Sequence, residues 1–402
     1  MSHVVLDIFL IYTVVIHKSS CYRFYIITIE NVKRIKVVLK TFYTINAGYM
    51  LTYAILSRKL YLVIGFQILE RTETAGGPEG PPLIILRGIT VSKPYLNYQQ
   101  QIQKLVQDKG LIITDYNFAE ENLKNIGYFS LIGGYKDPFI NPMTRKYEDN
   151  ATFEDLVRLY TFDEDLRNLT FKYLTKVEQK LRQLVSDSFC SQFGVQQSDY
   201  LSATNYTSNT RYSNDVTKLI TILDYHANKN TDQEYLVYQR RVYQNVPLWV
   251  ITKALTFGQL SKFYSLLQFR EQSIVCHAYK YLNEKNLGRY IHALTYFRNV
   301  CAHNERLYSH RLHQIDFPDS DLLRKMNIKK TGNKYNNGKQ DYFGLVVAFR
   351  YLLPKSDFLE YKKSLKRLID KYLQNNNRIS RDILLNKMGM PDNWERITRY
   401  KL

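Results

Sequence analysis

The feature that most constrains the fold is a tract over residues 152–194 in which apolar residues recur at helical spacing. Side chains three or four positions apart lie on one face of a helix, so the pattern predicts a long amphipathic helix. Gly194 predicts where this helix ends. The apolar face consists of Phe153, Leu156, Leu159, Tyr160, Leu166, Leu169, Leu174, Val177, Leu181 and Leu184.

Helical patterns also predict most of the chain after residue 93. Asp115 is a candidate N-cap, Pro247 suits a first helical turn, and Gly258 suggests a break between two halves of a helix pair. We expect residues 196–230 to form a loop with a short helix, and residues 321–340 to form a basic loop. The sequence therefore predicts an all-α body with at most a small hairpin. One further expected helix begins at Tyr98. The others cover residues 246–267, 273–282, 287 to about 306, 341–353 and 356–373.

The first 90 residues have a different character. Residues 4–16 are apolar but too short to span a membrane, and residues 37–56 have the length of a span but contain Lys40 and Asn46. A breaker-rich linker, ETAGGPEGPPL, follows at residues 73–83. Three readings stay open: a membrane anchor, β-rich packing, or upstream sequence translated from a start placed too early. We favour the third, with a helical domain over residues 91–402 that begins near Val91, so a membrane partner is not expected.

The charge of the chain suggests a polyanionic partner. The formal net charge is +19, and the chain contains 34 tyrosines and 20 phenylalanines. Basic and aromatic residues together suit RNA, because rings stack on unpaired bases. An alternative is that the aromatic residues fill the core and that A/T-rich codons favour Lys, Tyr, Ile and Asn.

The four cysteines predict neither a metal site nor a disulfide framework. Cys21, Cys190, Cys276 and Cys301 form no C-x-x-C pair, so a zinc site is not expected. A chain of this size does not need a disulfide framework, and a reducing cytoplasm fits this cysteine usage.

One short segment, YFRNVCAHNERLY at residues 296–308, mixes polar and apolar residues in an unusual way. A buried helix is not expected to carry polar residues such as Arg298, Asn299, His303 and Arg306. A fully solvated helix would not need the apolar residues between them. The segment is therefore the main candidate for a functional site. Its apolar members are Phe297, Val300, Cys301 and Leu307.

This segment resembles a known family. RNVCAH matches the R-N-x-x-x-H signature of HEPN-superfamily ribonucleases, and FRNVCAHNERLY is similar to the Abi-like abortive-infection proteins. IGYFSLIGGYKDPF, VPLWV, LTFG and MGMPDNW agree with the same family in the same order, so the resemblance spans about residues 93–396. One departure is Asn304, where the family often has a second histidine.

The resemblance implies an all-α, HEPN-like helical bundle with additional helices, and a function in phage defence through RNA cleavage or RNA binding. Some relatives act beside a small structured RNA. HEPN sites are commonly assembled from two copies of the motif, and this chain carries one, which implies a homodimer with one composite site. The expected chemistry needs no metal or other cofactor.

The residue types of the motif suit RNA cleavage. RNA carries its own nucleophile, the 2′-hydroxyl, so an enzyme needs a base, an acid and positive charge on the phosphate. A histidine such as His303 can transfer protons near neutral pH, and Arg298 presents a rigid fork to phosphate oxygens. Asn299 lies one turn before His303 and can orient the imidazole or the RNA. On a regular helix Arg298 and His303 point about 140° apart, so Arg298 must reach round, the helix must bend, or a partner chain must supply the other half of the site. We expect further RNA contacts from Arg306, Lys325, Lys329 and Lys330.

Each of these residues also has a structural explanation. A lone histidine on a mixed helix is usually a structural residue, and Arg298 can be half of a buried ion pair. The basic loop can simply be solvated. Cys301 is expected to pack in the core, and so is Trp249, whereas His310 and His313 are expected at the surface. The main alternative function is a non-catalytic RNA-binding protein, and a weaker one is a membrane-tethered effector.

Overall fold

The computed structural model describes residues 94–375 and 378–402, together with five strands in the N-terminal part of the chain. The chain divides into two compact units, residues 1–95 and residues 96–402. Every candidate site residue lies in the second unit. The linker at residues 73–83, Val91 and residues 44–51 of the span-length segment lie outside the described residues.

The N-terminal unit contains two separate antiparallel sheets. Strands β1 (Ile11–Ile16), β2 (Cys21–Ile29) and β3 (Ile35–Tyr43) form a three-stranded sheet in that order, in which Ile11 pairs with Ile27 and Cys21 with Tyr43. Strands β4 (Thr52–Leu56) and β5 (Lys59–Val63) form a hairpin. Both apolar segments, residues 4–16 and 37–56, therefore contain strands.

Residues 96–402 are all-α apart from one very short hairpin, as predicted. The hairpin pairs β6 (Lys330–Thr331) with β7 (Lys334–Tyr335). The α-helices are α1 (Tyr98–Gln107), α2 (Tyr116–Ile126), α3 (Phe153–Phe193), α4 (Gln197–Leu201), α5 (Ser213–Asp224), α6 (Glu234–Tyr243), α7 (Leu248–Ile251), α8 (Phe257–Leu266), α9 (Phe269–His277), α10 (Glu284–Ala302), α11 (Asp321–Lys325), α12 (Tyr342–Leu352), α13 (Lys355–Gln374) and α14 (Arg381–Met388). Short π- or 3₁₀-helical turns are η1 (Phe129–Gly133), η2 (Asp137–Phe139), η3 (Ala203–Asn205), η4 (Thr210–Tyr212), η5 (Tyr225–Lys229) and η6 (Trp394–Thr398).

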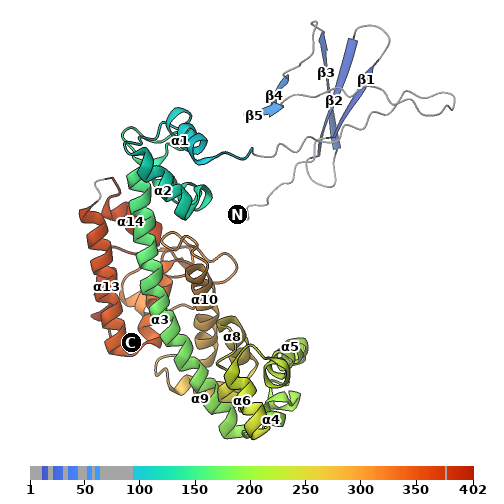
Figure 1. Cartoon of the computed structure of the whole chain (residues 1–402), viewed down its shortest axis with the longest axis vertical. Coiled ribbons are helices and arrows are strands. Elements are labelled where there is room, and N and C mark those ends of the chain that lie inside the picture. The colour runs from blue at the N-terminus through green and yellow to red at the C-terminus, as the bar shows by residue number, and fades with distance from the viewer. Residues whose placement is uncertain are drawn as a thin grey trace, which may run out of the picture. The chain divides into compact units, whose positions relative to one another are not determined.

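Helix α3 is the spine of this unit, and its two ends lie where the sequence predicted them. Thr152 caps the first turn in a capping box with Asp155, so each side chain satisfies a backbone N–H of the other residue. Gly194 ends the helix at φ +108°, and a Cβ there would lie 2.5 Å from an Asp199 oxygen. Helices α13, α10, α9, α8 and α7 pack against α3, and Figure 1 shows α13 running beside it.

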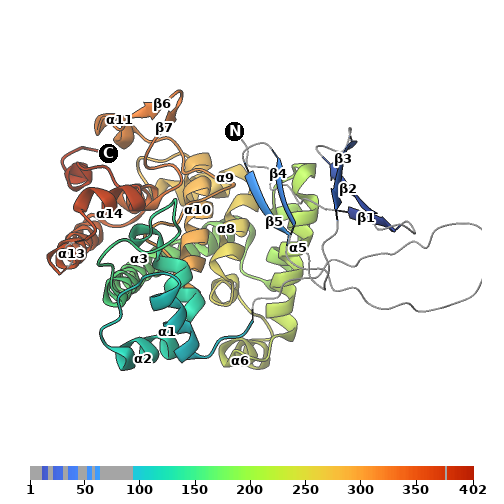
Figure 2. The ribbon, with the colours of Figure 1, turned by 90° about the horizontal axis from the view of Figure 1, so that it is seen from above.

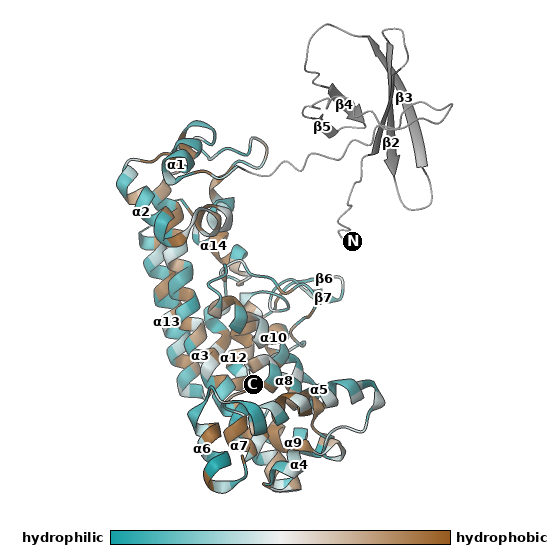
Figure 3. Cartoon of the chain, turned by 45° about the vertical axis from the view of Figure 1, so that its right-hand side comes forward, coloured by the Kyte–Doolittle hydropathy of each residue, from teal (hydrophilic) through white to brown (hydrophobic). Residues whose placement is uncertain are grey.

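The helices enclose one hydrophobic core. The helices carry hydrophobic and hydrophilic residues in alternation along their length, as amphipathic helices do (Figure 3). Helix α12 is an exception, since nearly all of its residues are buried. Seen from above, α13 lies on one side of α3, and α10 and α8 lie on the other (Figure 2). Helices α1 and α2 lie at one end of α3 (Figure 1).

Several predictions about helix positions are wrong. The helix expected at residues 273–282 is α9, which ends at His277, and the loop expected at residues 321–340 contains α11 and the hairpin. Residues 196–230 are largely helical. In α5, Val216, Leu219 and Leu223 recur at helical spacing and form a buried apolar face within an otherwise polar segment. The break in the 246–267 pair lies before α8 and not at Gly258. Thr256 and Gln259 form a capping box that starts α8, and Gly258 lies inside its first turn.

Among the helices of the described residues, none is both long enough and apolar enough to cross a membrane.

Candidate functional site

Helix α10 carries the motif segment and has two chemically different faces. Asn283 caps its first turn by accepting a hydrogen bond from the Asn286 N–H. The inner face packs in the core. It includes Phe297, Val300 and Cys301, which are buried within the chain. The outer face is exposed, and its residues recur every three or four positions: Lys285, Arg289, His292, Tyr296, Asn299 and His303.

The helix ends earlier than the sequence predicted, and the end itself positions the histidine. Ala302 is its last residue and His303 is the C-cap, whose N–H still bonds the Asn299 carbonyl at 2.9 Å. Asn304 adopts a left-handed conformation at φ +54°, which asparagine tolerates better than most residues. The Glu305 N–H then bonds the Val300 carbonyl at 3.0 Å, the pattern of a Schellman cap. His303 therefore stands on the last turn of α10, at the point where the chain reverses.

A buried aspartate fixes the chain that follows His303. The carboxylate of Asp163, on α3, is fully buried and accepts hydrogen bonds from the backbone N–H groups of Leu307 (2.8 Å) and Tyr308 (2.6 Å). A buried charge is tolerated only when it is paired and hydrogen-bonded. Asp163 thus anchors residues 305–308 to the spine of the fold.

Two further side chains complete this buried network. Arg167, one turn along α3, lies 2.9 Å from Asp163, and the Tyr135 hydroxyl donates to the same carboxylate at 2.7 Å. Arg167 also reaches the Glu305 carbonyl at 3.4 Å. Burial raises the pKa of Asp163, and Arg167 and the hydrogen-bond donors act in the opposite direction. The network ties two separate segments of the chain, α3 and the segment that contains Tyr135, to the end of the motif.

Arg298 points inward, toward α3. Its Nε lies 4.0 Å from a carboxylate oxygen of Glu178, which is itself nearly buried. Arg182 also pairs with Glu178 and bonds the Thr252 carbonyl. The Arg298 side chain keeps 29% of its surface exposed, so it is only partly enclosed. The structure therefore places Arg298 near a buried ion pair and on a different side of the helix from His303.

Asn299 and His303 lie together on the exposed face. They are four residues apart, which places them one turn from each other. Tyr296 precedes them on the same face, is 40% exposed, and contacts the ring of His292 at a centroid distance of 5.6 Å. This face combines titratable, amide and aromatic groups that the fold itself does not bury.

The predicted basic contacts divide into two groups. Arg306 is turned toward the chain, since it donates to the Gly134 carbonyl at 2.6 Å and pairs with Asp137 at 3.3 Å. Lys325 donates to the Lys401 carbonyl at 2.7 Å. Lys329 and Lys330 are exposed at the hairpin, where Lys330 lies over the Tyr335 ring. The structure does not bring these four side chains together with His303 into one cluster.

Three residues without an assigned role in the motif test the predicted environments. Cys301 is buried, as predicted, and burial raises the pKa of its thiol to about 12, so it is not a thiolate at neutral pH. The prediction for His310 is wrong, because its ring is largely covered and packs edge-to-face on Phe297. Trp249, predicted in the core, is 44% exposed.

No group of three or more His, Cys, Asp or Glu side chains within residues 94–375 and 378–402 is arranged to hold a metal ion.

Sequence reasoning missed the residues that hold the motif in place. Asp163 interrupts the apolar face of α3 between Leu159 and Leu166, and Arg167 follows it by four positions. An acid and a base at this spacing on an otherwise apolar face are a recognisable sign of a buried pair. Tyr135 gave no such signal, because only the folded chain brings it to Asp163.

Comparison with protein families gives one match, to the family described as Abi-like protein, over residues 121–309. The matched region runs from α2 to the residues after α10, so it contains both the motif and Asp163. Comparisons with curated proteins and with solved structures gave no match.

Proposed function

We propose, on the premise that residues 121–309 belong to the Abi-like protein family, that this protein is a metal-independent endoribonuclease of abortive-infection phage defence. The single observation that carries the proposal is the position of His303. It stands exposed on the last turn of α10, one turn after Asn299, in an intact Arg-Asn-x-x-x-His sequence. A histidine kept only for packing would be expected to pack against the core, as His310 does against Phe297.

The cleavage step uses two proton transfers. A base takes the proton of the RNA 2′-hydroxyl, and the 2′-oxygen attacks the adjacent phosphorus. The bond from phosphorus to the 5′-oxygen breaks, and an acid protonates that oxygen. The products are a 2′,3′-cyclic phosphate and a 5′-hydroxyl, so the reaction consumes no water. We assign one of the two proton transfers to His303, and we assign to Asn299 the orientation of the ring or of the phosphate.

A single chain holds Arg298 and His303 on different sides of α10, which is why we propose a homodimer. Pairing α10 with a second copy about a two-fold axis would bring Arg298 of one chain and His303 of the other to one phosphate. Arg298 would then stabilise the charge on the phosphate from its partly exposed position near Glu178. The exposed polar face of α10 supports this arrangement, since a composite site requires accessible groups there.

The test is cleavage of total RNA by the purified full chain in EDTA, beside His303→Ala. We expect the wild type to leave 2′,3′-cyclic phosphate ends and His303→Ala to lose about 10²–10⁴-fold of the rate, as removal of an acid or base does. His277→Ala is the matched control, because His277 is also exposed but lies at the end of α9. Equal rates for wild type and His303→Ala, at equal purity, would refute the catalytic assignment.

The composite site has its own test. Arg298→Ala and His303→Ala chains are purified separately, shown to be inactive, and then mixed under conditions that exchange subunits. Recovered cleavage supports a site shared between chains. Light scattering that finds only monomers in protein that still cuts RNA would rule out the shared site.

A non-catalytic RNA-binding protein, partnered by a small structured RNA, is the second candidate. The net charge of +19 favours it as much as it favours a nuclease. RNA that binds with unchanged affinity to wild type and His303→Ala, and that neither protein cuts, would identify this function.

A further inference from the structure

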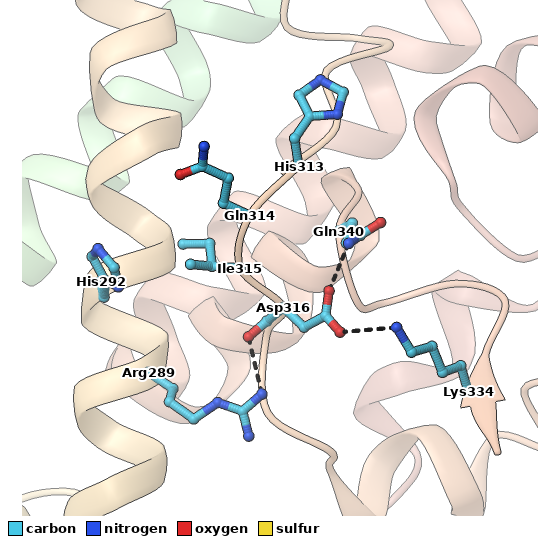
Figure 4. Close-up of a pocket in the computed structure, with 8 residues that line it drawn as sticks. All are labelled: Arg289, His292, His313, Gln314, Ile315, Asp316, Lys334 and Gln340. Carbon is cyan, nitrogen blue, oxygen red and sulfur yellow. Dashed lines mark hydrogen bonds and ion pairs between the residues drawn. The ribbon is translucent and has the colours of Figure 1, made fainter. Parts of the chain in front are cut away.

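A polar cavity lies beside the outer face of α10, nearer the beginning of the helix than His303. It has a volume of about 410 Å³. Arg289 and His292 line it from α10, His313 and Asp316 from the segment after the motif, and Lys334 and Gln340 from the hairpin region. Figure 4 shows Lys334 reaching toward Asp316 from the side opposite to α10.

We infer that this cavity is a nucleotide-binding subsite for the RNA strand that is cut at His303. The inference rests on the proposed function for the identity of the reacting site. The cavity itself is defined by residues that the motif does not include and that have no role in the cleavage step.

The position of the cavity on α10 supports this assignment. His292 and His303 are eleven positions apart, which at about 100° per residue leaves them roughly 20° apart around the helix. The rise of about 1.5 Å per residue places them about 16 Å apart along its axis. Stacked nucleotides advance by roughly 3.4 Å, so about five of them, or fewer in an extended strand, would cover this distance.

The charges of the cavity suit a phosphate. Arg289 and Lys334 bring two cations, and Asp316 is the one carboxylate among the lining residues. Asp316 is already engaged, since it accepts from Gln340 at 2.7 Å, and its backbone carbonyl accepts from Arg289 at 3.3 Å. Lys334 lies 4.0 Å from Asp316 and is 80% exposed, so its ammonium can turn toward a ligand. Two cations and one carboxylate, which already accepts hydrogen bonds, leave the cavity with a net positive charge that attracts an anion.

The groups between the cavity and His303 suit a nucleic acid more than a simple anion. The exposed ring of Tyr296 lies between His292 and Asn299 on the outer face, where a base can stack on it. Partial burial and the charge of Lys262 lower the pKa of His292, so its ring is neutral at pH 7 and can both donate and accept hydrogen bonds. The face thus offers cations, then a ring, then an amide and the imidazole of His303.

The experiment compares short and long substrates with the Arg289→Ala/Lys334→Ala double variant. A dinucleotide occupies only the reacting site, whereas a twelve-nucleotide RNA cut at its centre reaches the cavity. We expect the double variant to raise KM for the long RNA by about tenfold and to leave both constants for the dinucleotide unchanged. Arg241→Ala, which removes an exposed charge from α6, is the control. An unchanged KM for the long RNA would overturn the inference.

A binding measurement separates this inference from the proposed cleavage. In the His303→Ala background, affinity for the same RNA is measured by fluorescence anisotropy over a range of salt concentrations. Loss of two phosphate contacts should reduce the slope of log K against log[salt] by about 1.4. This result would support the subsite even if the wild type cuts no RNA. An equal loss of affinity for heparin and for single-stranded DNA of the same length would show a general anion site and would overturn the nucleotide assignment.

Discussion

The two sides of the last turns of α10 differ in how their polar groups are used. On the inner side Arg298 faces Glu178, and Asp163 holds the chain that follows the helix. On the outer side Asn299 and His303 are exposed, together with Tyr296 and His292. One short segment thus contains both the groups that fix its conformation and the groups that remain accessible to a ligand.

This difference explains why the segment mixes polar and apolar residues. A functional site needs side chains that are held in place by their surroundings but remain available to bind a ligand. Here the apolar residues and Asp163 hold the backbone, and the accessible polar residues lie on the opposite face. Arg298 is intermediate, since it is partly exposed but close to a buried carboxylate. It is the residue at which the comparison can be tested most directly.

The largest effect is expected at Asp163. Asp163→Ala leaves Arg167 buried without its charge partner and removes the acceptor for two backbone N–H groups. Breaking such a pair costs about 3–5 kcal/mol. We expect this loss in the free energy of unfolding from urea titration. Glu164→Gln is the control, because Glu164 is the exposed neighbour and should change the free energy by less than about 0.5 kcal/mol. A loss below about 1 kcal/mol for Asp163→Ala would mean that the inner side does not hold the motif.

Arg298→Ala distinguishes a structural arginine from a catalytic one. Glu178 keeps Arg182 as a partner after this change, so we expect a stability loss of only about 1 kcal/mol. If Arg298 acts on the phosphate, cleavage should fall by roughly 10²–10³-fold. Glu178→Gln gives the comparison, since it removes the ion pairs of Glu178 with both Arg298 and Arg182 but keeps the Arg298 side chain. An equal loss of cleavage in both variants would assign Arg298 to the inner, structural side.

His310, in the segment after α10, should make the stability of the fold depend on pH. Burial, with smaller contributions from His313, Arg311 and Arg306, lowers the pKa of His310 to about 4. The unfolded chain takes up a proton near pH 6.5 and the folded chain does not until about pH 4. The folded state therefore has its full advantage above pH 6.5 and loses it as the pH falls toward 4.

His310→Phe tests this pH dependence, because the phenylalanine ring keeps the contact with Phe297 and does not titrate. Between pH 6.5 and 4 the wild type should lose roughly 1–2 kcal/mol more than the variant, allowing for the partial exposure of the ring. The measurement is urea unfolding at a series of pH values. Parallel curves for the two proteins would show that His310 is not protected from protonation.

The sequence predicted the helices well where a local signal marks each end. Thr152 and Gly194 bound α3 as expected, and Asp115 caps α2 by accepting from the Phe118 N–H. The predictions failed where two local signals compete. Gly258 suggests a break between two helices, but the capping box of Thr256 and Gln259 determines where α8 starts. The predicted end of α10, near residue 306, is too late. Asparagine tolerates the left-handed conformation that Asn304 adopts but does not require it, so the residue type alone does not predict the cap.

The candidate site was predictable only in part. The pattern of Arg298, Asn299 and His303 identified the segment, and helical spacing placed Asn299 beside His303. Helical spacing alone did not indicate that Arg298 faces Glu178, because Glu178 lies 120 positions earlier on another helix. The direction of Arg306 was missed for the same reason, since its partners Gly134 and Asp137 come from a distant loop.

The smallest effect is expected from removing the first 90 residues. The unit of residues 96–402 contains α10, Asp163, Glu178 and the cavity beside Arg289, so both sides of the motif lie within it. A chain that begins at Val91 also keeps Asn97, whose side chain caps α1 together with Gln100. We expect this shortened chain to be soluble and to unfold within about 0.5 kcal/mol of the full chain. Its cleavage of the twelve-nucleotide RNA should also be unchanged. An inactive or insoluble shortened chain, beside an active full chain, would show that the N-terminal unit supports the site. Recovery of the full chain, but not of the shortened one, in the membrane fraction would instead assign a tethering role to the N-terminal unit. That result would leave the comparison of the two faces of α10 unchanged.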